Sequence, residues 1–165
     1  MSEFESQRNN DERWMRVAIE IAREGVARGQ TPFGACIVGA DGREVVRAHN
    51  VVWETTDITA HAEVTAIRRA CTALGAIDLS ACTIYSTCEA CPMCFSACHW
   101  ARVARIVYGA SIADAQGAGF NELAISNEQM KRRGGSGVVV AGGVLREENV
   151  ALFGDWVKLG NRRVY

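Results

Sequence analysis

Two short motifs constrain this chain more than any other feature: His61-Ala62-Glu63 and, further along, Cys91-Pro92-Met93-Cys94. One imidazole and two thiolates form a ligand set that zinc prefers, and three protein ligands leave the fourth tetrahedral position open for water. Zinc lowers the pKa of such a water to about 7, so that a hydroxide is available at neutral pH. The fold must therefore bring His61, Cys91 and Cys94 together from two separate parts of the chain.

Glu63 lies two positions after the histidine and is expected to carry protons rather than to bind the metal. Two other interpretations of the motifs are open at this point. A lone Cys-x-x-Cys is also typical of redox-active sites, and a fourth ligand from Cys88 or His99 would convert the site into a closed, structural one. The combination of both motifs, each at the expected start of a helix, favours the open catalytic site.

The remaining pattern predicts strands that alternate with helices. Apolar residues recur at helical spacing from Met15 to Val26, and Asp41-Gly42 is a hairpin turn signal between two apolar segments. Thr59 is the expected N-cap of the helix that Gly75 ends. We expect helices over 15–26, 62–74, 91–101 and 147–160, a short helix near 128, and strands at 35–38, 45–49, 83–85, 106–108 and 138–140.

Alternating strands and helices predict an α/β fold, a three-layer α/β/α sandwich around a five-stranded mixed sheet. A chain of 165 residues with 48% apolar side chains suits a single domain, residues 1–165. Ligands of such sheets bind beyond the carboxyl ends of the strands. Both motifs fall at this edge, each at the start of a helix whose free N–H groups favour negative charge.

The overall charge and the cysteines limit the classes of partner and location. The formal net charge is -1 and the pI about 6.3, which argues against the basic balance typical of nucleic-acid-binding domains. Residues 1–13 lack the apolar core of a secretory signal, and no apolar run approaches the roughly 18 residues of a membrane span. Seven cysteines, an odd number, favour a reducing cytoplasmic location with free thiols.

These features together establish a family resemblance. His-x-Glu followed by Cys-x-x-Cys is the signature of zinc nucleobase deaminases, and the chain resembles the cytidine deaminase-like superfamily. Within it, the chain closely resembles the small bacterial guanine deaminases, from about Ala18 to Tyr165. The matching segments are 32–35, 49–50, 59–68, 91–94, 100–102, 114–115 and 118–120, together with a C-terminal tyrosine that follows two basic residues.

The resemblance implies a reaction and a role for each candidate residue. The reaction is the hydrolytic deamination of guanine to xanthine and ammonia, a step of purine metabolism, with Zn2+ as the cofactor. Zinc would be bound by His61, Cys91 and Cys94, and the catalytic residues would be Glu63 and Asp114. The substrate contacts would be the side chains of Phe33, Asn50, Trp100 and Tyr165, together with the backbone N–H of Ala62.

The resemblance also implies a homodimer. In the family the C-terminal segment, residues 145–165 here, crosses to the neighbouring subunit, so that Tyr165 would act in trans in a domain-swapped dimer. The apolar character of this segment agrees with burial against another surface. A small nucleobase is the expected substrate, whereas nucleic acid and membranes are not expected as partners.

Two departures from the family pattern leave other substrates open. Ala90 stands where a proline precedes the first cysteine, and Ile58 stands where the family often has proline. Cytosine, a triazine such as ammeline, a nucleoside and tRNA adenosine are therefore alternative substrates. A zinc-stabilised scaffold that binds a partner through its apolar C-terminus is the non-enzymatic alternative.

Overall fold

The computed structural model describes residues 2–165. Its centre is a five-stranded sheet in the order β2-β1-β3-β4-β5. Strand β1 is antiparallel to β2 and β3, whereas β4 is parallel to β3 and β5, which confirms the predicted mixed sheet. The strands are β1 (Gly34–Val38), β2 (Glu44–His49), β3 (Thr83–Cys88), β4 (Arg105–Ala110) and β5 (Val139–Ala141).

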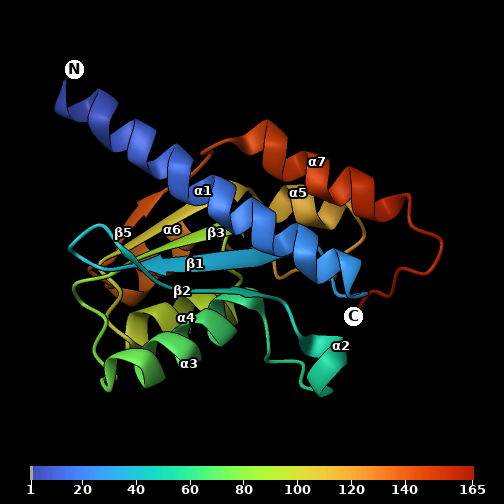
Figure 1. The fold of residues 1–165 in the computed structure, drawn as a ribbon, viewed down its shortest axis with the longest axis horizontal. Coiled ribbons are helices and arrows are strands. Elements are labelled where there is room, and N and C mark those ends of the chain that lie inside the picture. Colours follow the sequence, from blue (N-terminus) through green and yellow to red (C-terminus); the bar gives the residue numbers. More distant parts are fainter. Residues whose placement is uncertain (1) are drawn as a thin grey trace.

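Helices cover both faces of the sheet, which confirms the predicted three-layer sandwich (Figure 1). Helices α1 and α7 lie on one face, and α3 and α4 on the other. Strand side chains alternate accordingly, so that Ala35 and Ile37 are buried with residues of α3 and α4, whereas Cys36 is buried against α1. The helices are α1 (Glu3–Ala27), α2 (Val52–Thr55), α3 (Ala62–Leu74), α4 (Pro92–Trp100), α5 (Ile112–Gly117), α6 (Asn127–Gly134) and α7 (Arg146–Val157).

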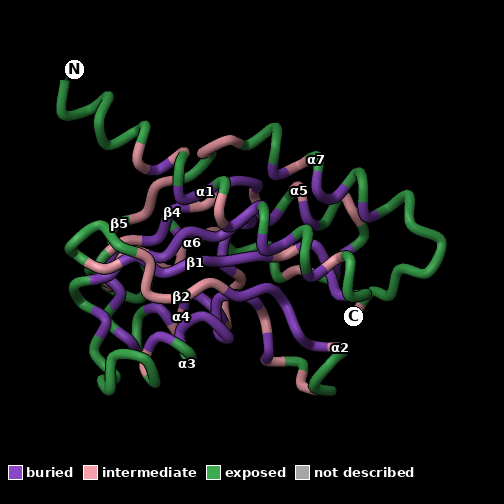
Figure 2. The backbone as a smooth tube through the Cα atoms, in the orientation of Figure 1, coloured by how far each residue is buried: buried purple, intermediate pink, exposed green. Residues whose placement is uncertain are grey.

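One edge of the sheet gathers the segments that carry the motifs. Strand β3 ends at Cys88, which is paired with Ala110 at the end of β4. Strand β2 ends at His49, which is paired with Gly34 at the start of β1. The chain that leaves β2 toward α2 is buried (Figure 2). The loops that follow these strands therefore begin side by side at one edge.

Helix α1 begins at Glu3, well before the expected start near residue 15. The Ser2 hydroxyl accepts a hydrogen bond from the Glu5 N–H at 3.2 Å, and the Glu5 carboxylate accepts one from the Ser2 N–H at 2.8 Å. This reciprocal capping box starts a helix whose first turns are exposed to solvent. Although α1 has 25 residues, no helix within residues 2–165 is long and apolar enough to cross a membrane.

The N-cap expected at Thr59 is wrong by two residues. His61 occupies the N-cap position of α3 and makes no side-chain capping hydrogen bond. The Thr59 hydroxyl instead donates to Asp57 Oδ1 at 2.6 Å. Gly75 ends α3 in the left-handed conformation, with φ of 61°, which confirms that prediction.

Gly34 marks a close approach of α1 to the sheet. A Cβ atom there would lie 2.3 Å from the Ala18 carbonyl oxygen and 2.7 Å from the Ala22 nitrogen, both backbone atoms of α1. We therefore expect Gly34→Ala to lower the free energy of unfolding by about 1–3 kcal/mol, the usual penalty of overpacking. Chemical denaturation measures the change, and an unaltered stability would contradict the packing described.

Gly154→Ala is the matched control for this substitution. Gly154 lies inside α7, and a Cβ atom there would meet no atom within 4 Å. Alanine is favoured over glycine inside a helix by about 0.5–1 kcal/mol. The same substitution should therefore stabilise the protein at this second position.

Candidate active site

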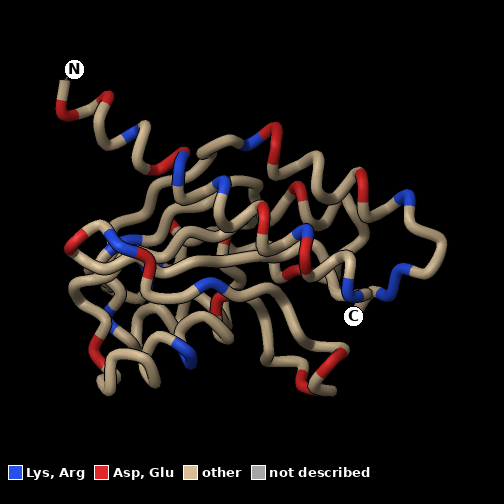
Figure 3. Tube along the Cα trace, viewed as in Figure 1, with Lys and Arg blue, Asp and Glu red and all other residues tan. Residues whose placement is uncertain are grey.

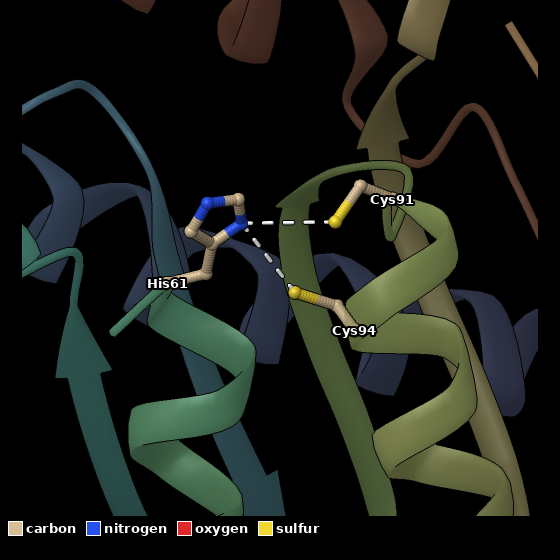
Figure 4. Close-up of side chains that lie close together, drawn as sticks. All are labelled: His61, Cys91 and Cys94. Atoms are coloured by element: carbon tan, nitrogen blue, oxygen red, sulfur yellow. Dashed lines mark hydrogen bonds between the residues drawn. The ribbon is translucent and has the colours of Figure 1, made fainter. Parts of the chain in front are cut away.

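Three candidate metal ligands converge at the sheet edge from the starts of two helices. His61 is the N-cap of α3, Cys91 is the N-cap of α4, and Cys94 lies in the first turn of α4. His61 Nδ1 lies 3.7 Å from Cys91 Sγ and 3.6 Å from Cys94 Sγ (Figure 4). Pro92 occupies the first position of α4, where its fixed φ suits the start of a helix.

The spacing of these ligand atoms fits zinc. Tetrahedral bonds of about 2.05 Å to nitrogen and 2.3 Å to sulfur place those two atoms about 3.6 Å apart. All three ligand atoms lie within 4.8 Å of one another. The hydrogen bond from Cys94 lowers the pKa of the Cys91 thiol to about 4, against the effect of burial and with help from His61. The donor set therefore suits a zinc ion held by three protein ligands.

No fourth protein ligand joins this cluster within residues 2–165. The Cys88 thiol donates to the Ser111 carbonyl oxygen at 3.5 Å. His99 Nδ1 lies 3.0 Å from the Ser136 hydroxyl, near the far end of α4. The structure therefore gives no support to a closed, four-ligand site.

Glu63 lies beside the cluster in the first turn of α3, with 6% of its surface exposed. Its Oε1 accepts a hydrogen bond from the Ser86 hydroxyl at 3.1 Å. Burial raises the pKa of this carboxyl, and the nearby Cys91 thiolate raises it further. The raised pKa makes this carboxyl a stronger proton acceptor than an ordinary glutamate, which suits a proton carrier.

A second carboxyl, Glu122, faces the same space and was missed in the sequence analysis. It lines an inner cavity of about 10 Å³ together with Glu63, and also an outer cavity of about 300 Å³. Burial raises the pKa of Glu122 to about 7, and the negative charges of Cys91 and Glu63 add to this effect. Glu122 lies in a segment without helix or strand, so no periodic pattern could have marked it.

Asp114, the second predicted catalytic residue, lies elsewhere. Its Oδ2 accepts hydrogen bonds from the N–H and the hydroxyl of Ser111, both at 2.9 Å, and its Oδ1 pairs with Arg146 at 2.5 Å. Partial burial opposes its ionisation, but these partners lower its pKa. Asp114 lines neither cavity. The structure thus places it in the cap of α5 and does not bring it to the predicted catalytic position.

Trp100, a predicted substrate contact, also lies outside the site. It ends α4, at the opposite end of that helix from Cys91, and 82% of its surface is exposed. Its ring makes an edge contact with His99, with ring centroids 6.0 Å apart. This position does not allow Trp100 of the same chain to stack on a substrate beside the metal ligands.

Asn50 and Tyr165, two further predicted substrate contacts, meet at the site. Asn50 Nδ2 donates to the Tyr165 hydroxyl at 2.6 Å, and Asn50 Oδ1 accepts from the Val52 N–H at 3.1 Å. The Tyr165 ring centroid is 5.6 Å from that of His61, and Tyr165 lines the outer cavity. In this single chain Tyr165 covers the site of its own subunit, and its action in trans stays a prediction.

Phe33 and Ala62 border the site. Phe33 lines the inner cavity and packs edge-on against Phe120, with ring centroids 4.8 Å apart. Ala62 is the first residue of α3, so its N–H has no carbonyl partner within that helix. Such an N–H can donate to a ligand oxygen near the helix start. Phe33 thus forms an aromatic wall of the inner cavity, and Ala62 offers a hydrogen-bond donor at the start of the helix that carries Glu63.

Comparisons with known proteins agree with this chemistry. The family model for the cytidine and deoxycytidylate deaminase zinc-binding region matches residues 8–110. The chain is 40% identical over 157 residues to guanine deaminase of Bacillus subtilis, covering 94% of this chain and 99% of that protein. It is 38% identical over 138 residues to the tRNA-specific adenosine deaminase of the same organism, covering 84% and 83%. A solved structure of guanine deaminase from Nitrosomonas europaea superposes with a TM-score of 0.84 at 28% identity, covering 96% of this chain and 94% of that one.

The raised pKa of Glu122 predicts a pH-dependent stability of the metal-free protein. The pKa is about 7 in the folded state, against an ordinary value of 4.5. The folded state therefore holds this proton more tightly, and the resulting stabilisation is complete below pH 4.5 and is lost as the pH rises through 7. Glu122→Gln should raise the free energy of unfolding by on the order of 1 kcal/mol at pH 8 and change it little at pH 4.5.

Urea denaturation of the chelated protein at both pH values measures this difference. Glu24→Gln on the exposed face of α1 is the control, because it removes a carboxylate without touching the cavity. A Glu122→Gln variant that is equally destabilised at both pH values would contradict the electrostatic account.

Proposed function

The chain belongs to the zinc-binding family of cytidine and deoxycytidylate deaminases, and we propose that it is a zinc-dependent guanine deaminase, which converts guanine and water into xanthine and ammonia. The observation that carries the proposal is the cluster of His61, Cys91 and Cys94. This cluster borders a cavity that also contains the buried Glu63. The likeness to a guanine deaminase, at 40% identity over 94% of the chain, supports guanine as the substrate.

Glu63 performs the first proton transfer. A zinc ion held by His61, Cys91 and Cys94 would supply a water that is nucleophilic at neutral pH. Glu63 would accept a proton from the attacking water and deliver it to the ring nitrogen next to C2 of guanine, and C2 would gain the water oxygen. Ser86 holds the Glu63 carboxylate in place through its hydrogen bond. Proton transfer of this kind typically contributes about 10²–10⁴-fold to the rate.

Release of ammonia requires a second proton transfer. Glu122 shares the inner cavity with Glu63, and a pKa of about 7 allows its carboxyl to hold a proton near neutral pH. We assign to Glu122 the assistance to the departing amino group that had been predicted for Asp114. One proton of the water stays on the ring nitrogen, the other leaves with ammonia, and the oxygen remains on C2 of xanthine.

Recognition of the base uses groups that lie around the ligand cluster and its two cavities. Asn50 and the Ala62 N–H donate hydrogen bonds to the oxygen and nitrogen atoms of the purine, and Phe33 contacts its apolar ring system. Tyr165 covers the bound base. The outer cavity has a volume of about 300 Å³ and an apolar rim formed by Ile58, Pro92, Met93 and Leu123, which suits a free base better than a polar ribose.

Conversion of guanine to xanthine, followed by ultraviolet absorbance, tests the proposal. The zinc-loaded protein should turn over guanine, and Glu63→Gln should lower kcat by at least about 10²-fold. Metal analysis should find the same zinc content in both, because Glu63 is not a ligand. Wild-type turnover in Glu63→Gln would refute the role of this residue. A zinc-loaded wild type with no turnover would refute guanine as the substrate.

Asp114→Asn is the matched control for this experiment. It removes a carboxylate from a residue that lines neither cavity, and it keeps an oxygen that can cap α5. Its kcat should stay within about twofold of wild type, because no proton transfer depends on it. A loss as large as that of Glu63→Gln would restore the catalytic role predicted for Asp114.

A tRNA adenosine deaminase is the second candidate function, because such an enzyme is 38% identical to this chain over 84% of its length. The net charge of -1 argues against it, as does the mixture of acidic and basic residues along the chain (Figure 3). Binding to a phosphate backbone requires concentrated positive charge. Deamination of tRNA without turnover of guanine would favour this function. The same screen covers cytosine, ammeline and nucleosides.

The assembly and the location complete the proposal. We infer a homodimer in which residues 145–165 exchange between subunits, and a cytoplasmic location in which none of the seven cysteines forms a disulfide. The exchange is supported by the apolar contacts of α7, where Leu152, Phe153 and Trp156 are buried. The same contacts can be made by the equivalent segment of a second copy, because both surfaces belong to one sequence.

Mixing two inactive variants tests the exchange. Glu63→Gln lacks the proton carrier and Tyr165→Ala lacks the covering residue, so each alone should show little activity. In swapped mixed dimers, a site with Glu63 receives an intact Tyr165 from the other subunit. Half of the dimers are mixed and half of their sites are complete, so about a quarter of the wild-type activity should return. Unfolding and refolding the two variants together allows the exchange, and no recovery would show that Tyr165 acts within its own chain.

A further inference from the structure

We propose that Trp53 is a positioning residue. Its contacts with the C-terminal tail, residues 158–165, form a clasp that keeps Tyr165 over the active site. Trp53 belongs to the short helix α2, which begins two residues after Asn50. None of the sequence motifs includes Trp53, and it lines neither cavity of the site. The proposal rests on the proposed function, because it concerns how that site is closed.

Two contacts join Trp53 to the tail at the same residue. The Trp53 Nε1–H donates to the Arg163 carbonyl oxygen at 3.3 Å. The Arg163 guanidinium also lies over the indole, 4.5 Å from the ring centroid, which is a cation–π contact. Arg163 precedes Tyr165 by two residues, so these contacts fix the backbone just before the covering side chain. The rings of Trp53 and Tyr165 are themselves 6.2 Å apart.

The backbone of Trp53 is itself held by a buried residue of the protein. The Trp53 N–H donates to Gln30 Oε1 at 3.2 Å, and Gln30 is only 4% exposed. The preceding residue, Val52, donates its N–H to Asn50 Oδ1. The Trp53 indole and the Asn50 amide, which both contact the tail, therefore belong to one short segment, residues 50–53. The Tyr165 hydroxyl meets Asn50 and also lies 3.4 Å from Thr31 Oγ1.

The strength of the clasp sets how firmly the tail is held. Tyr165 lines the outer cavity, so movement of the tail changes access to the site. A cation–π contact and a hydrogen bond at an exposed position are both weak, so their joint loss should change the closed population by only about tenfold. Such a clasp favours the closed state while allowing release of product.

Loss of the clasp should affect KM more than kcat. Tyr165 covers the bound substrate and the bound transition state alike. A less populated closed state therefore weakens the binding of both to the same extent. We expect Trp53→Ala to raise KM for guanine about tenfold and to leave kcat at or above that of wild type. Trp53→Phe keeps an aromatic face for Arg163 but loses the Nε1–H donor, so its KM should lie between the two.

Hydrogen–deuterium exchange of the tail amides tests the clasp without any substrate. In the zinc-loaded protein, residues 158–165 should exchange about tenfold faster in Trp53→Ala than in wild type. Phe4→Ala is the matched control, because Phe4 is an exposed aromatic residue in the first turn of α1, with 79% of its surface exposed. Its tail exchange and its KM should equal those of wild type.

The outcomes separate the clasp from the proposed function. Faster tail exchange in Trp53→Ala with a raised KM supports the clasp. Unchanged tail exchange in Trp53→Ala would overturn it, as would a lowered kcat at unchanged KM. If the wild type does not deaminate guanine, the proposed function fails, and the exchange measurement alone decides whether Trp53 holds the tail.

Discussion

The active site depends on two helices, α3 and α4, that begin side by side at one edge of the sheet. Their N-cap positions are occupied by His61 and Cys91, and neither makes a side-chain capping hydrogen bond. The helices α1, α5 and α6, which carry no metal ligand, each begin with a reciprocal capping box. A side-chain cap is typically worth about 1 kcal/mol. The two ligand-bearing helices, α3 and α4, therefore lack this local stabilisation. Packing on the sheet and binding of the metal must keep their N-terminal ends in place.

A second constraint follows from placing two carboxyl groups in a cavity of about 10 Å³. Burial raises the pKa of both Glu63 and Glu122, the Cys91 thiolate adds to both effects, and the charge of Glu63 adds to that on Glu122, whose pKa reaches about 7. The same environment that destabilises two carboxylates makes them suitable proton carriers. A zinc ion held by the ligand cluster that borders the cavity would offset part of the repulsion between these negative charges with its positive charge. Stability, metal binding and proton transfer are thus properties of one small group of side chains.

The parts of the molecule that could be predicted are those with a periodic or spaced signal. The apolar run from Ala35 to Val38 and the paired motifs at 61–63 and 91–94 led to the correct sheet and to the converging metal ligands. Glu122 could not be predicted, because a single acid in an irregular loop has no pattern, and burial is decided by tertiary packing. The structure of this chain places Asp114 in the cap of α5 and Trp100 at the far end of α4, and family order alone cannot show which way such side chains face. The contacts of the tail with Asn50 and Trp53 join distant parts of the sequence, and no local rule reveals them.

X-ray absorption at the zinc edge of the zinc-loaded protein distinguishes an open catalytic site from a closed structural one, because it counts the ligands of the metal without needing a substrate. The account predicts two sulfur ligands from Cys91 and Cys94, one imidazole nitrogen from His61, and one further oxygen that is not a protein ligand. Displacement of that oxygen by an added anion should change the spectrum while the two sulfur ligands remain. A third sulfur, which Cys88 would have to supply, or a second imidazole from His99 would show a closed structural site and would contradict the catalytic account.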